Sequence, residues 1–386
     1  MSLRTAITAP RIFDGQRWHE DSALLIENGH CEGIVAAAAI PPGYAIKLAN
    51  GPMIVPGFVD LQVNGGGGLQ FNDALSANAI STICAAHARF GTTSVMVTLI
   101  TDTPEVTARA VDAGVEAAES GVRGFTGLHL EGPHLSLARK GAHDPALIRP
   151  MTDADVAALI AARKRLPALM TTVAPESVTR DQVSALTDAG IAVSLGHSDT
   201  DCATAQRYAA AGARMVTHLF NAMSPLTHRE PGMVGAALDT GTLSAGLIAD
   251  GIHVDPVAIR IALAAKRGPG HVFLVTDAMA PLGTEMEGFE LNGRAIRRDG
   301  NRLTLDDGTL AGADIDMAAS VRFLVHEVGV DLDEALRMAT AWPAQALGTA
   351  DGKGTLGTGT AADYAVLDDD LGVVSTWISG HEVFRR

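Results

Sequence analysis

Four side chains that could bind a metal ion or move a proton come at or near the ends of predicted strands. Glu131 ends LHLE, His197 follows SLG, His218 lies in VTHLFNAM and Asp277 follows LVT. A carboxylate and two neutral imidazoles, with one position left open for water, form a common catalytic zinc site. The sequence therefore predicts metal ligands at Glu131, His197 and His218. Because a carboxylate that is not a ligand can take a proton from zinc-activated water, Asp277 is the candidate general base.

Each of these residues also has a structural interpretation. A single histidine at a strand end is usually a hydrogen-bonded residue, and Asp277 could cap a helix. The metal site is favoured because three residues from separate strands occupy matching positions. Asp60 is interpreted as a structural residue at the same rim and receives no chemical role.

A second group of residues could bind an anion. His143 lies in RKGAHDP, Arg229 in THREPG and His253 in ADGIHVD, while Asn221 and Ala222 closely follow a predicted strand. Arginine binds phosphate through two parallel hydrogen bonds, histidine adds a donor, and backbone N–H groups can point at a ligand. The spacing alone leaves an ordinary surface role open for these residues.

The elements that must position these side chains alternate along the chain. Short β-branched runs predict eight strands, which recur about every 31 residues; they cover 57–62, 92–98, 124–130, 168–174, 191–196, 214–218, 244–249 and 271–276. Ala-rich helical patterns lie between most of them, and several begin after Asp, Ser or Thr. We therefore expect a (β/α)8 TIM-like barrel with its site at the carboxyl ends of the strands. An open, doubly wound sheet is less favoured because the run Gly65–Gly68 lacks the GxGxxG spacing.

The two ends of the chain have a different pattern. Residues 1–55 and 354–386 contain alternating strands and turn pairs such as Asp14-Gly15. We expect them to pair into one small β-sandwich domain beside a barrel domain of residues 56–353. The insert 283–308 predicts a hairpin over the barrel mouth.

Composition excludes several classes of protein. The 386 residues are 47% hydrophobic, which argues against disorder. Their net charge of −15 argues against a nucleic-acid-binding role. Three widely spaced cysteines predict neither a disulfide framework nor a thiolate zinc site. No signal sequence or stretch long enough to span a membrane is seen, so the expected location is the cytoplasm, with no membrane partner.

The motifs together resemble the N-acetylglucosamine-6-phosphate deacetylase family of the amidohydrolase superfamily. The resemblance runs over nearly the whole chain and rests on PGFVDLQVNGGGG (56–68), GLHLEGPHL (127–135), KGAHDP (140–145), APE (174–176), GHSD (196–199), THLFNAM (217–223), REPG (229–232), ADGIHVD (249–255), VTDAMAP (275–281) and GTLAG (308–312). It implies hydrolysis of N-acetyl-D-glucosamine 6-phosphate to D-glucosamine 6-phosphate and acetate.

The resemblance also implies a role for each candidate residue. Glu131, His197 and His218 would hold the metal, and Asp277 would act first as general base and then as general acid. His143 would polarise the acetyl carbonyl. The sugar phosphate would meet Asn221, Ala222, His253 and, from the neighbouring subunit of a homodimer, Arg229.

One departure bears on the metal content. Many amidohydrolases carry HxH after the first strand, whereas this chain has Gln62-Val63-Asn64, and amides are poor zinc ligands. We therefore expect one divalent metal per chain, with Zn2+ favoured over Fe2+, Co2+ or Mn2+. Two alternatives stay open: another N-acetyl amino sugar phosphate such as N-acetylgalactosamine 6-phosphate as substrate, and a non-catalytic barrel that binds a sugar phosphate. A cyclic-amide hydrolase is less favoured, given Gln62 and Asn64.

Overall fold

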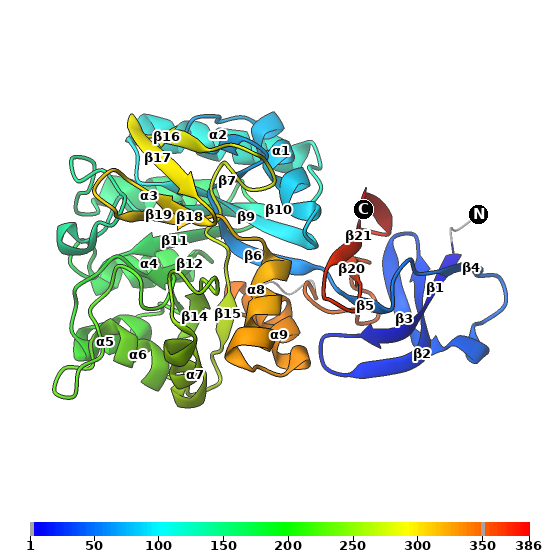
Figure 1. Ribbon diagram of the computed structural model, residues 1–386. Helices are drawn as coiled ribbons and strands as arrows, with labels where there is room; N and C mark the ends of the chain where they lie inside the picture. Colours follow the sequence, from blue (N-terminus) through cyan, green and yellow to red (C-terminus); the bar gives the residue numbers. More distant parts are fainter. Residues whose placement is uncertain (1–3, 349–351) are drawn as a thin grey trace.

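The computed structural model describes residues 4–348 and 352–386 and consists of a barrel beside a smaller β-rich part (Figure 1). The barrel takes up the middle of the chain, and both ends of the described chain lie in the β-rich part. This arrangement confirms the predicted fold class. The exact domain boundaries at 55/56 and 353/354 stay a prediction.

Eight parallel strands form the barrel, paired in the order β15-β14-β13-β12-β11-β10-β9-β6. They are β6 (Phe58–Val63), β9 (Thr92–Ile100), β10 (Phe125–Glu131), β11 (Leu169–Val173), β12 (Ala192–Leu195), β13 (Met215–Val216), β14 (Ser244–Leu247) and β15 (Val272–Leu274). The two ends of this order, β15 and β6, are joined at a seam just past β15, where the Asp277 N–H donates to the Gln62 carbonyl at 2.9 Å. All eight predicted strands are confirmed. Strand β13 is shorter than its predicted range 214–218, because His218 turns into a left-handed conformation with φ 29°.

Helices follow the strands and cover the outside of the barrel (Figure 1). They are α1 (Ala77–Ala88), α2 (Pro104–Glu119), α3 (Asp153–Arg163), α4 (Arg180–Asp188), α5 (Cys202–Ala210), α6 (Gly232–Asp239), α7 (Pro256–Ala265), α8 (Met317–Phe323), the π-helix η3 (Leu324–Val328), α9 (Leu332–Ala339) and α10 (Ala341–Leu347). Side chains cap several of them as predicted; Thr152 and Thr179, for example, each form a capping box. Two short 3-10 helices, η1 (Ala37–Ala39) and η2 (Leu137–Arg139), lie in loops.

The interior of the barrel changes from apolar to polar along the strands. Met96, Met170, Met215 and Phe273 belong to one buried apolar cluster. Thr172 and Thr217 come two residues after Met170 and Met215. Together with His129 and Ser194 of the neighbouring strands they form a chain of contacts of 2.7 Å each. Since side chains two apart on a strand share a direction, Glu131 stands above His129 at the carboxyl end. The polar layer therefore supports the rim where the predicted site lies.

The two ends of the chain meet in one eight-stranded sheet. Its order is β22-β21-β20-β5-β1-β2-β3, with β4 also paired to β1. The strands are β1 (Arg4–Phe13), β2 (Trp18–Glu27), β3 (His30–Ala36), β4 (Ala45–Leu48), β5 (Met53–Pro56), β20 (Tyr364–Leu367), β21 (Val373–Ile378) and β22 (His381–Arg385). The antiparallel pairing of β5 with β20 joins the two terminal segments. The prediction that both ends build one small β-rich unit is therefore confirmed.

The insert after β15 forms a four-stranded antiparallel meander rather than a single hairpin. Its four antiparallel strands are β16 (Gly288–Leu291), β17 (Arg294–Asp299), β18 (Arg302–Thr304) and β19 (Leu310–Ala313), and they lie across the barrel (Figure 1). A further short pair, β7 (Gly65–Gly66) and β8 (Leu69–Gln70), follows β6. Apolar side chains of the insert pack against Ile100 and Met279 of the barrel, which fixes the insert beside the strand ends.

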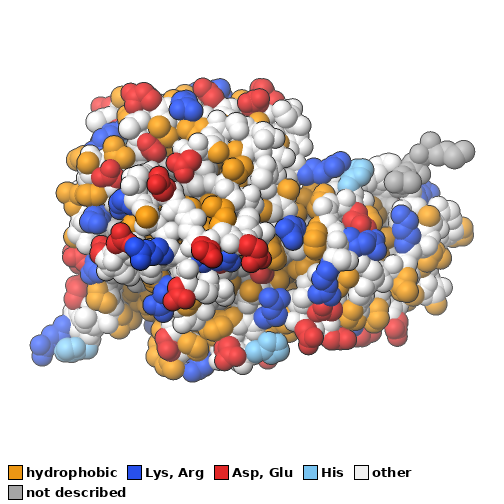
Figure 2. Space-filling model, turned by 45° about the horizontal axis from the view of Figure 1, so that its top comes forward, with side chains coloured by type: hydrophobic (Ala, Val, Ile, Leu, Met, Phe, Trp, Pro, Cys, Tyr) orange, Lys and Arg blue, Asp and Glu red, His pale blue; other side chains and the backbone are white. Residues whose placement is uncertain are grey.

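Basic and acidic side chains are interspersed over the face in Figure 2. All three cysteines are free thiols. Within residues 4–348 and 352–386, no helix is both long enough and apolar enough to cross a membrane.

Candidate active site

A cavity of about 380 Å³ lies at the carboxyl ends of the barrel strands. Eight of the nine residues predicted from the sequence line it: Glu131, His143, His197, His218, Asn221, Ala222, His253 and Asp277. Leu291 and residues 309–312 of the insert complete its wall. Arg229 does not line the cavity; it is exposed on the loop before α6. A single chain thus brings together every predicted site residue except Arg229.

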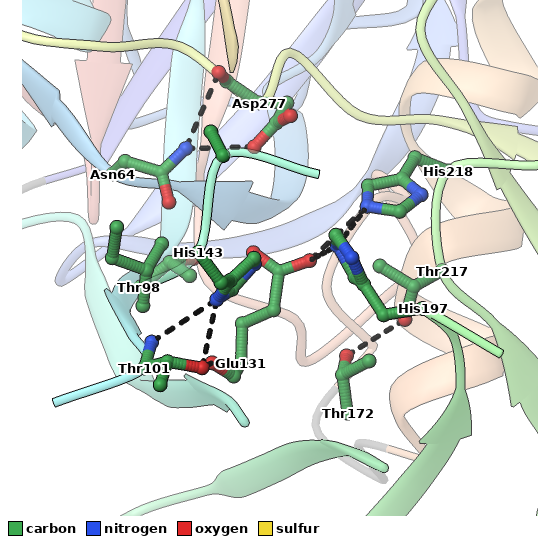
Figure 3. A network of polar contacts seen from close by, with 12 residues as sticks. Asn64, Thr98, Thr101, Glu131, His143, Thr172, His197, Thr217, His218 and Asp277 are labelled. Carbon is green, nitrogen blue, oxygen red and sulfur yellow. Dashed lines mark hydrogen bonds and ion pairs between the residues drawn. The ribbon is translucent and has the colours of Figure 1, made fainter. Parts of the chain in front are cut away.

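Three of these side chains converge on one point (Figure 3). His218 Nε2 lies 3.1 Å from Glu131 Oε1 and 3.0 Å from His197 Nε2, and His197 Nε2 lies 3.2 Å from Glu131 Oε1. Two ligand atoms of a tetrahedral zinc ion, each about 2.0–2.2 Å from the metal, lie about 3.3–3.6 Å apart. The three atoms are therefore spaced nearly as the ligands of one metal ion.

The tautomer of His197 supports the same conclusion. Its Nδ1 lies 2.8 Å from the Arg139 carbonyl oxygen, which can only accept, so Nδ1 carries the proton of the neutral ring. Nε2 then presents a lone pair towards the carboxylate oxygen of Glu131. Two lone pairs at this distance repel unless a cation or a proton lies between them. The donor set fits a divalent ion, and the outer hydrogen bond is of the kind that orients metal-binding histidines.

His143 lies beside this cluster and is buried. Its Nε2 is 3.8 Å from Glu131 Oε2, and donor atoms of Glu131, His143 and His197 all lie within 4.8 Å of one another. Thr101 contacts His143 Nδ1 twice: its hydroxyl oxygen lies 2.7 Å from this nitrogen, and its N–H points at the same atom at 3.4 Å. Burial, helped by the nearby His197, lowers the pKa of His143 to about 3, so the ring is neutral near pH 7. The ring could serve as a hydrogen-bond donor to a substrate or as a further metal ligand.

Asp277 faces the cavity from the segment after β15. Its Oδ1 accepts a hydrogen bond of 2.7 Å from Asn64 Nδ2 (Figure 3). Burial, and next the negative charge of Glu131, raise the pKa of Asp277 to about 6. A carboxyl with a pKa near the working pH can both accept and return a proton, as a general base and acid must. Asp60, in contrast, bonds to Thr276 behind the rim and does not line the cavity.

His253 is oriented by an acidic partner on its own loop. Asp250 Oδ2 lies 2.6 Å from His253 Nδ1, while Asp250 Oδ1 accepts from the backbone N–H groups of Ile252 and His253. Burial raises the pKa of Asp250, but these hydrogen bonds outweigh it and hold the pKa below its ordinary value. The ionised Asp250 therefore fixes the ring so that Nε2 is left for a ligand.

Several site residues have a strained backbone. His197, His218, Ala222 and Asp277 have φ values of 47°, 29°, 50° and 53°, in the left-handed region that is costly for residues other than glycine. Such conformations cluster at functional sites, where the surrounding structure enforces them. Here they occur where the strands end and the chain turns into the loops that line the cavity.

The sequence interpretation missed the residues that hold these groups in place. Thr101, Asp250 and Arg139 contact His143, His253 and His197, and a single sequence gives no signal for such contacts. Gln62 and Asn64 had a signal, their place after the first strand, but they were interpreted only as poor metal ligands. Both are buried and donate to site carboxylates: Gln62 to Glu131 and Asn64 to Asp277.

A parallel eight-stranded barrel with a carboxylate–imidazole cluster at its mouth defines the class of protein, a metal-dependent hydrolase. The model of the amidohydrolase family matches residues 53–383. Two curated relatives are an N-acetylgalactosamine-6-phosphate deacetylase of Shewanella sp. (strain ANA-3), 42% identical over 88% of this chain and 85% of the relative, and an N-acetylglucosamine-6-phosphate deacetylase of Homo sapiens, 38% identical over 87% and 84%.

A solved structure agrees with these relatives. The N-acetylglucosamine-6-phosphate deacetylase of Pasteurella multocida superposes with a TM-score of 0.94 at 32% sequence identity, covering 99% of this chain and 100% of that one. The chain belongs to the N-acetylglucosamine-6-phosphate deacetylase family of amidohydrolases, as the sequence motifs predicted.

Proposed function

We propose that this chain hydrolyses the acetamido bond of N-acetyl-D-glucosamine 6-phosphate and releases D-glucosamine 6-phosphate and acetate. The convergence of Glu131, His197 and His218 beside Asp277 in one cavity carries this proposal. Family membership and the printed activities of the relatives support the substrate class.

We propose Glu131, His197 and His218 as the ligands of one divalent ion per chain. Zn2+ is favoured, and Fe2+, Co2+ and Mn2+ also suit imidazole and carboxylate donors. When bound, such an ion would supply an electrophile for the carbonyl oxygen and lower the pKa of water. Gln62 would not be a ligand; its Nε2–H donates to Glu131 Oε1 at 3.1 Å and so holds the carboxylate.

Asp277 would carry the proton through the reaction. It accepts a proton from the attacking water, the water oxygen bonds to the acetyl carbon, and the C–N bond breaks as Asp277 returns the proton to the amine nitrogen. His143 would donate its Nε2–H to the carbonyl oxygen while negative charge develops there. Donors already in place at that atom lower the activation free energy of the reaction because they need not reorganise during the step.

The phosphate group would bind at the other end of the cavity. His253, held by Asp250 through Nδ1, would donate from Nε2 to a phosphate oxygen when its ring carries both protons, and Asn221 and Ala222 would add contacts from the loop after β13. We propose a homodimer in which the exposed Arg229 of one subunit reaches the phosphate in the other subunit's cavity. A cytoplasmic location stays a prediction.

A second substrate has its own support. The relative from Shewanella, at 42% identity, is an N-acetylgalactosamine-6-phosphate deacetylase. The gluco and galacto sugars differ in the orientation of one hydroxyl, which leaves the acetamido and phosphate groups unchanged. The proposed residues would therefore serve either epimer.

The test is acetate release from both phosphorylated epimers and from unphosphorylated N-acetylglucosamine. We expect turnover of at least one phosphorylated sugar and a much lower kcat/KM for the unphosphorylated one. Turnover of the galacto epimer alone would replace the first substrate with the second. Binding of both phosphorylated sugars without acetate release from metal-loaded protein would favour the non-catalytic barrel.

A further inference from the structure

Two amide side chains after β6 each donate to a carboxylate of the site. Gln62 and Asn64 are each 1% exposed. Gln62 Nε2 lies 3.1 Å from Glu131 Oε1, and Asn64 Nδ2 lies 2.7 Å from Asp277 Oδ1. Gln62 therefore holds a proposed metal ligand, whereas Asn64 holds the proposed proton carrier.

The side-chain hydrogen bonds of Asn64 all go to Asp277. Its Nδ2 also lies 3.3 Å from the Asp277 backbone carbonyl, and its Oδ1 is buried without a hydrogen-bond partner among the described residues. Every hydrogen bond that the structure records for this side chain thus goes to one residue. Figure 3 shows Asn64 facing Asp277 across the seam, with dashed lines to its carboxylate and its carbonyl.

The backbone around this contact is fixed on both sides. The Asn64 N–H donates to the Ala278 carbonyl at 2.9 Å, and the Asn64 carbonyl accepts from the Phe71 N–H at 2.9 Å. Asp277 itself donates to the Gln62 carbonyl across the same seam. Because both main chains are anchored, the side-chain bond leaves the Asp277 carboxylate little freedom to rotate.

The bond also distinguishes the two carboxylate oxygens. Oδ1 is occupied by Asn64, whereas Oδ2 has no hydrogen-bond partner among the described residues. We propose that Asn64 is a positioning residue for proton transfer: it holds Oδ1 of Asp277 so that Oδ2 faces the cavity and exchanges the proton. This inference rests on the proposed function, in which Asp277 is the proton carrier.

Positioning of this kind predicts a particular kinetic effect. A misplaced general base slows the chemical step but leaves the sugar and phosphate contacts intact. We expect Asn64→Ala to lower kcat by about 10- to 100-fold, as loss of an orienting partner commonly does, with KM and metal content little changed. Gln62→Ala should instead weaken metal binding, because its partner is Glu131.

A double-mutant cycle tests whether Asn64 acts through Asp277. Acetate release would be followed for the parent, Asn64→Ala, Asp277→Asn and the double variant, each loaded with metal and analysed for metal content. If Asn64 works only by placing Asp277, its substitution should change kcat less than about twofold once Asp277 is already replaced. An equal loss of kcat in both backgrounds would overturn the assignment.

Asn72→Ala is the matched control. Asn72 is another buried asparagine that donates to an aspartate, with its Nδ2 3.0 Å from Asp102 Oδ2, but it does not line the cavity. We expect this control to lower the thermal midpoint at least as much as Asn64→Ala while keeping kcat within about threefold. A matching kcat loss in the control would reduce Asn64 to a structural role and overturn the proposal.

The possible outcomes distinguish a failure of this inference from a failure of the proposed function. No acetate release by the parent, or near-normal turnover by Asp277→Asn, would overturn the proposed function and the inference with it. A large loss in Asp277→Asn beside normal kcat in Asn64→Ala would overturn the role of Asn64 alone. If Asn64→Ala does not fold, Asn64→Ser replaces it in the cycle; its hydroxyl keeps a donor on a shorter side chain, so a partial loss of kcat is expected.

Discussion

The Nε2 atoms of His197 and His218 lie 3.0 Å apart, and both face Oε1 of Glu131. Because the Arg139 carbonyl holds the proton of neutral His197 on Nδ1, the Nε2 lone pair of His197 faces the carboxylate oxygen of Glu131 at 3.2 Å. A cation at that point would turn a repulsive arrangement into a stabilising one. The geometry of the three residues is therefore the strongest argument for a metal site.

Loss of one proposed ligand should remove the metal and the activity together. We expect His218→Ala to retain well below one metal per chain and to lower kcat/KM by about 10³-fold or more, because the ion contributes several kcal/mol to transition-state stabilisation. Metal analysis and acetate release would be measured on the same sample. His326→Ala, at an exposed histidine on η3, is the control and should match the parent. Full metal content in His218→Ala would exclude it as a ligand.

Removal of the metal should also lower stability. An ion that binds only the folded chain adds about 2.7 kcal/mol to the free energy of unfolding at a concentration 100 times its Kd. We expect a chelator to lower the thermal midpoint of the parent and to have little effect on His218→Ala. An equal shift in both proteins would contradict binding at this site.

Asp250 should govern phosphate binding through His253. We expect Asp250→Ala to raise KM for the phosphorylated sugar about 10-fold or more, because a hydrogen bond to a charged group is worth about 1.5–3 kcal/mol. KM for the unphosphorylated sugar should rise much less. Asp255→Ala, which removes the cap of α7 a few residues away, controls for damage to the loop. An equal rise in KM for both sugars would show that Asp250 does not act on the phosphate site.

Asp60 should make stability depend on pH. Burial raises its pKa from 3.8 to about 7, so the folded state favours the neutral carboxyl. Between these pH values the chain must release this proton on unfolding, and the contribution of Asp60 to stability is lost as pH rises. We expect the parent to lose stability relative to Asp60→Asn from about pH 4 to pH 7, as measured by urea unfolding. A constant difference over that range would show that Asp60 stays ionised in the folded chain.

Arg229 should act across the subunit interface. Arg229→Ala and Asp277→Asn would each be weakly active alone, for different reasons. In a mixed dimer, the chain with an intact Asp277 would receive Arg229 from its partner, which restores one complete site. We therefore expect turnover of the mixture, after subunit exchange, to exceed the sum of the two separate proteins. No gain, despite mixed dimers detected by native mass spectrometry, would contradict a shared site.

The fold was predictable because its signals are local. The β-branched runs, the capping residues and their spacing of about 31 residues marked all eight barrel strands and most helices. Several strands are shorter than their predicted ranges, and β13 is one of them. His218 leaves the strand in a left-handed conformation that costs energy for a histidine, and no local propensity predicts it.

The candidate site was predictable in part for a different reason. Strand ends meet at one rim of a barrel, so Glu131, His197, His218 and Asp277 could be placed together without knowing any contact. The supporting residues could not be found this way, because Asn64 and Asp250 act through hydrogen bonds formed only in the folded chain. Arg229 lies outside the cavity of its own chain, and its contact with a partner's site stays a proposal.

The most direct test of the central claim is acetate release from N-acetylglucosamine 6-phosphate and its galacto epimer as metal is added back to metal-free protein. We predict no turnover without metal and a rise that saturates at about one divalent ion per chain. Turnover by the metal-free protein would contradict a metal-dependent hydrolase built on Glu131, His197 and His218. So would full metal loading with no acetate released from either sugar.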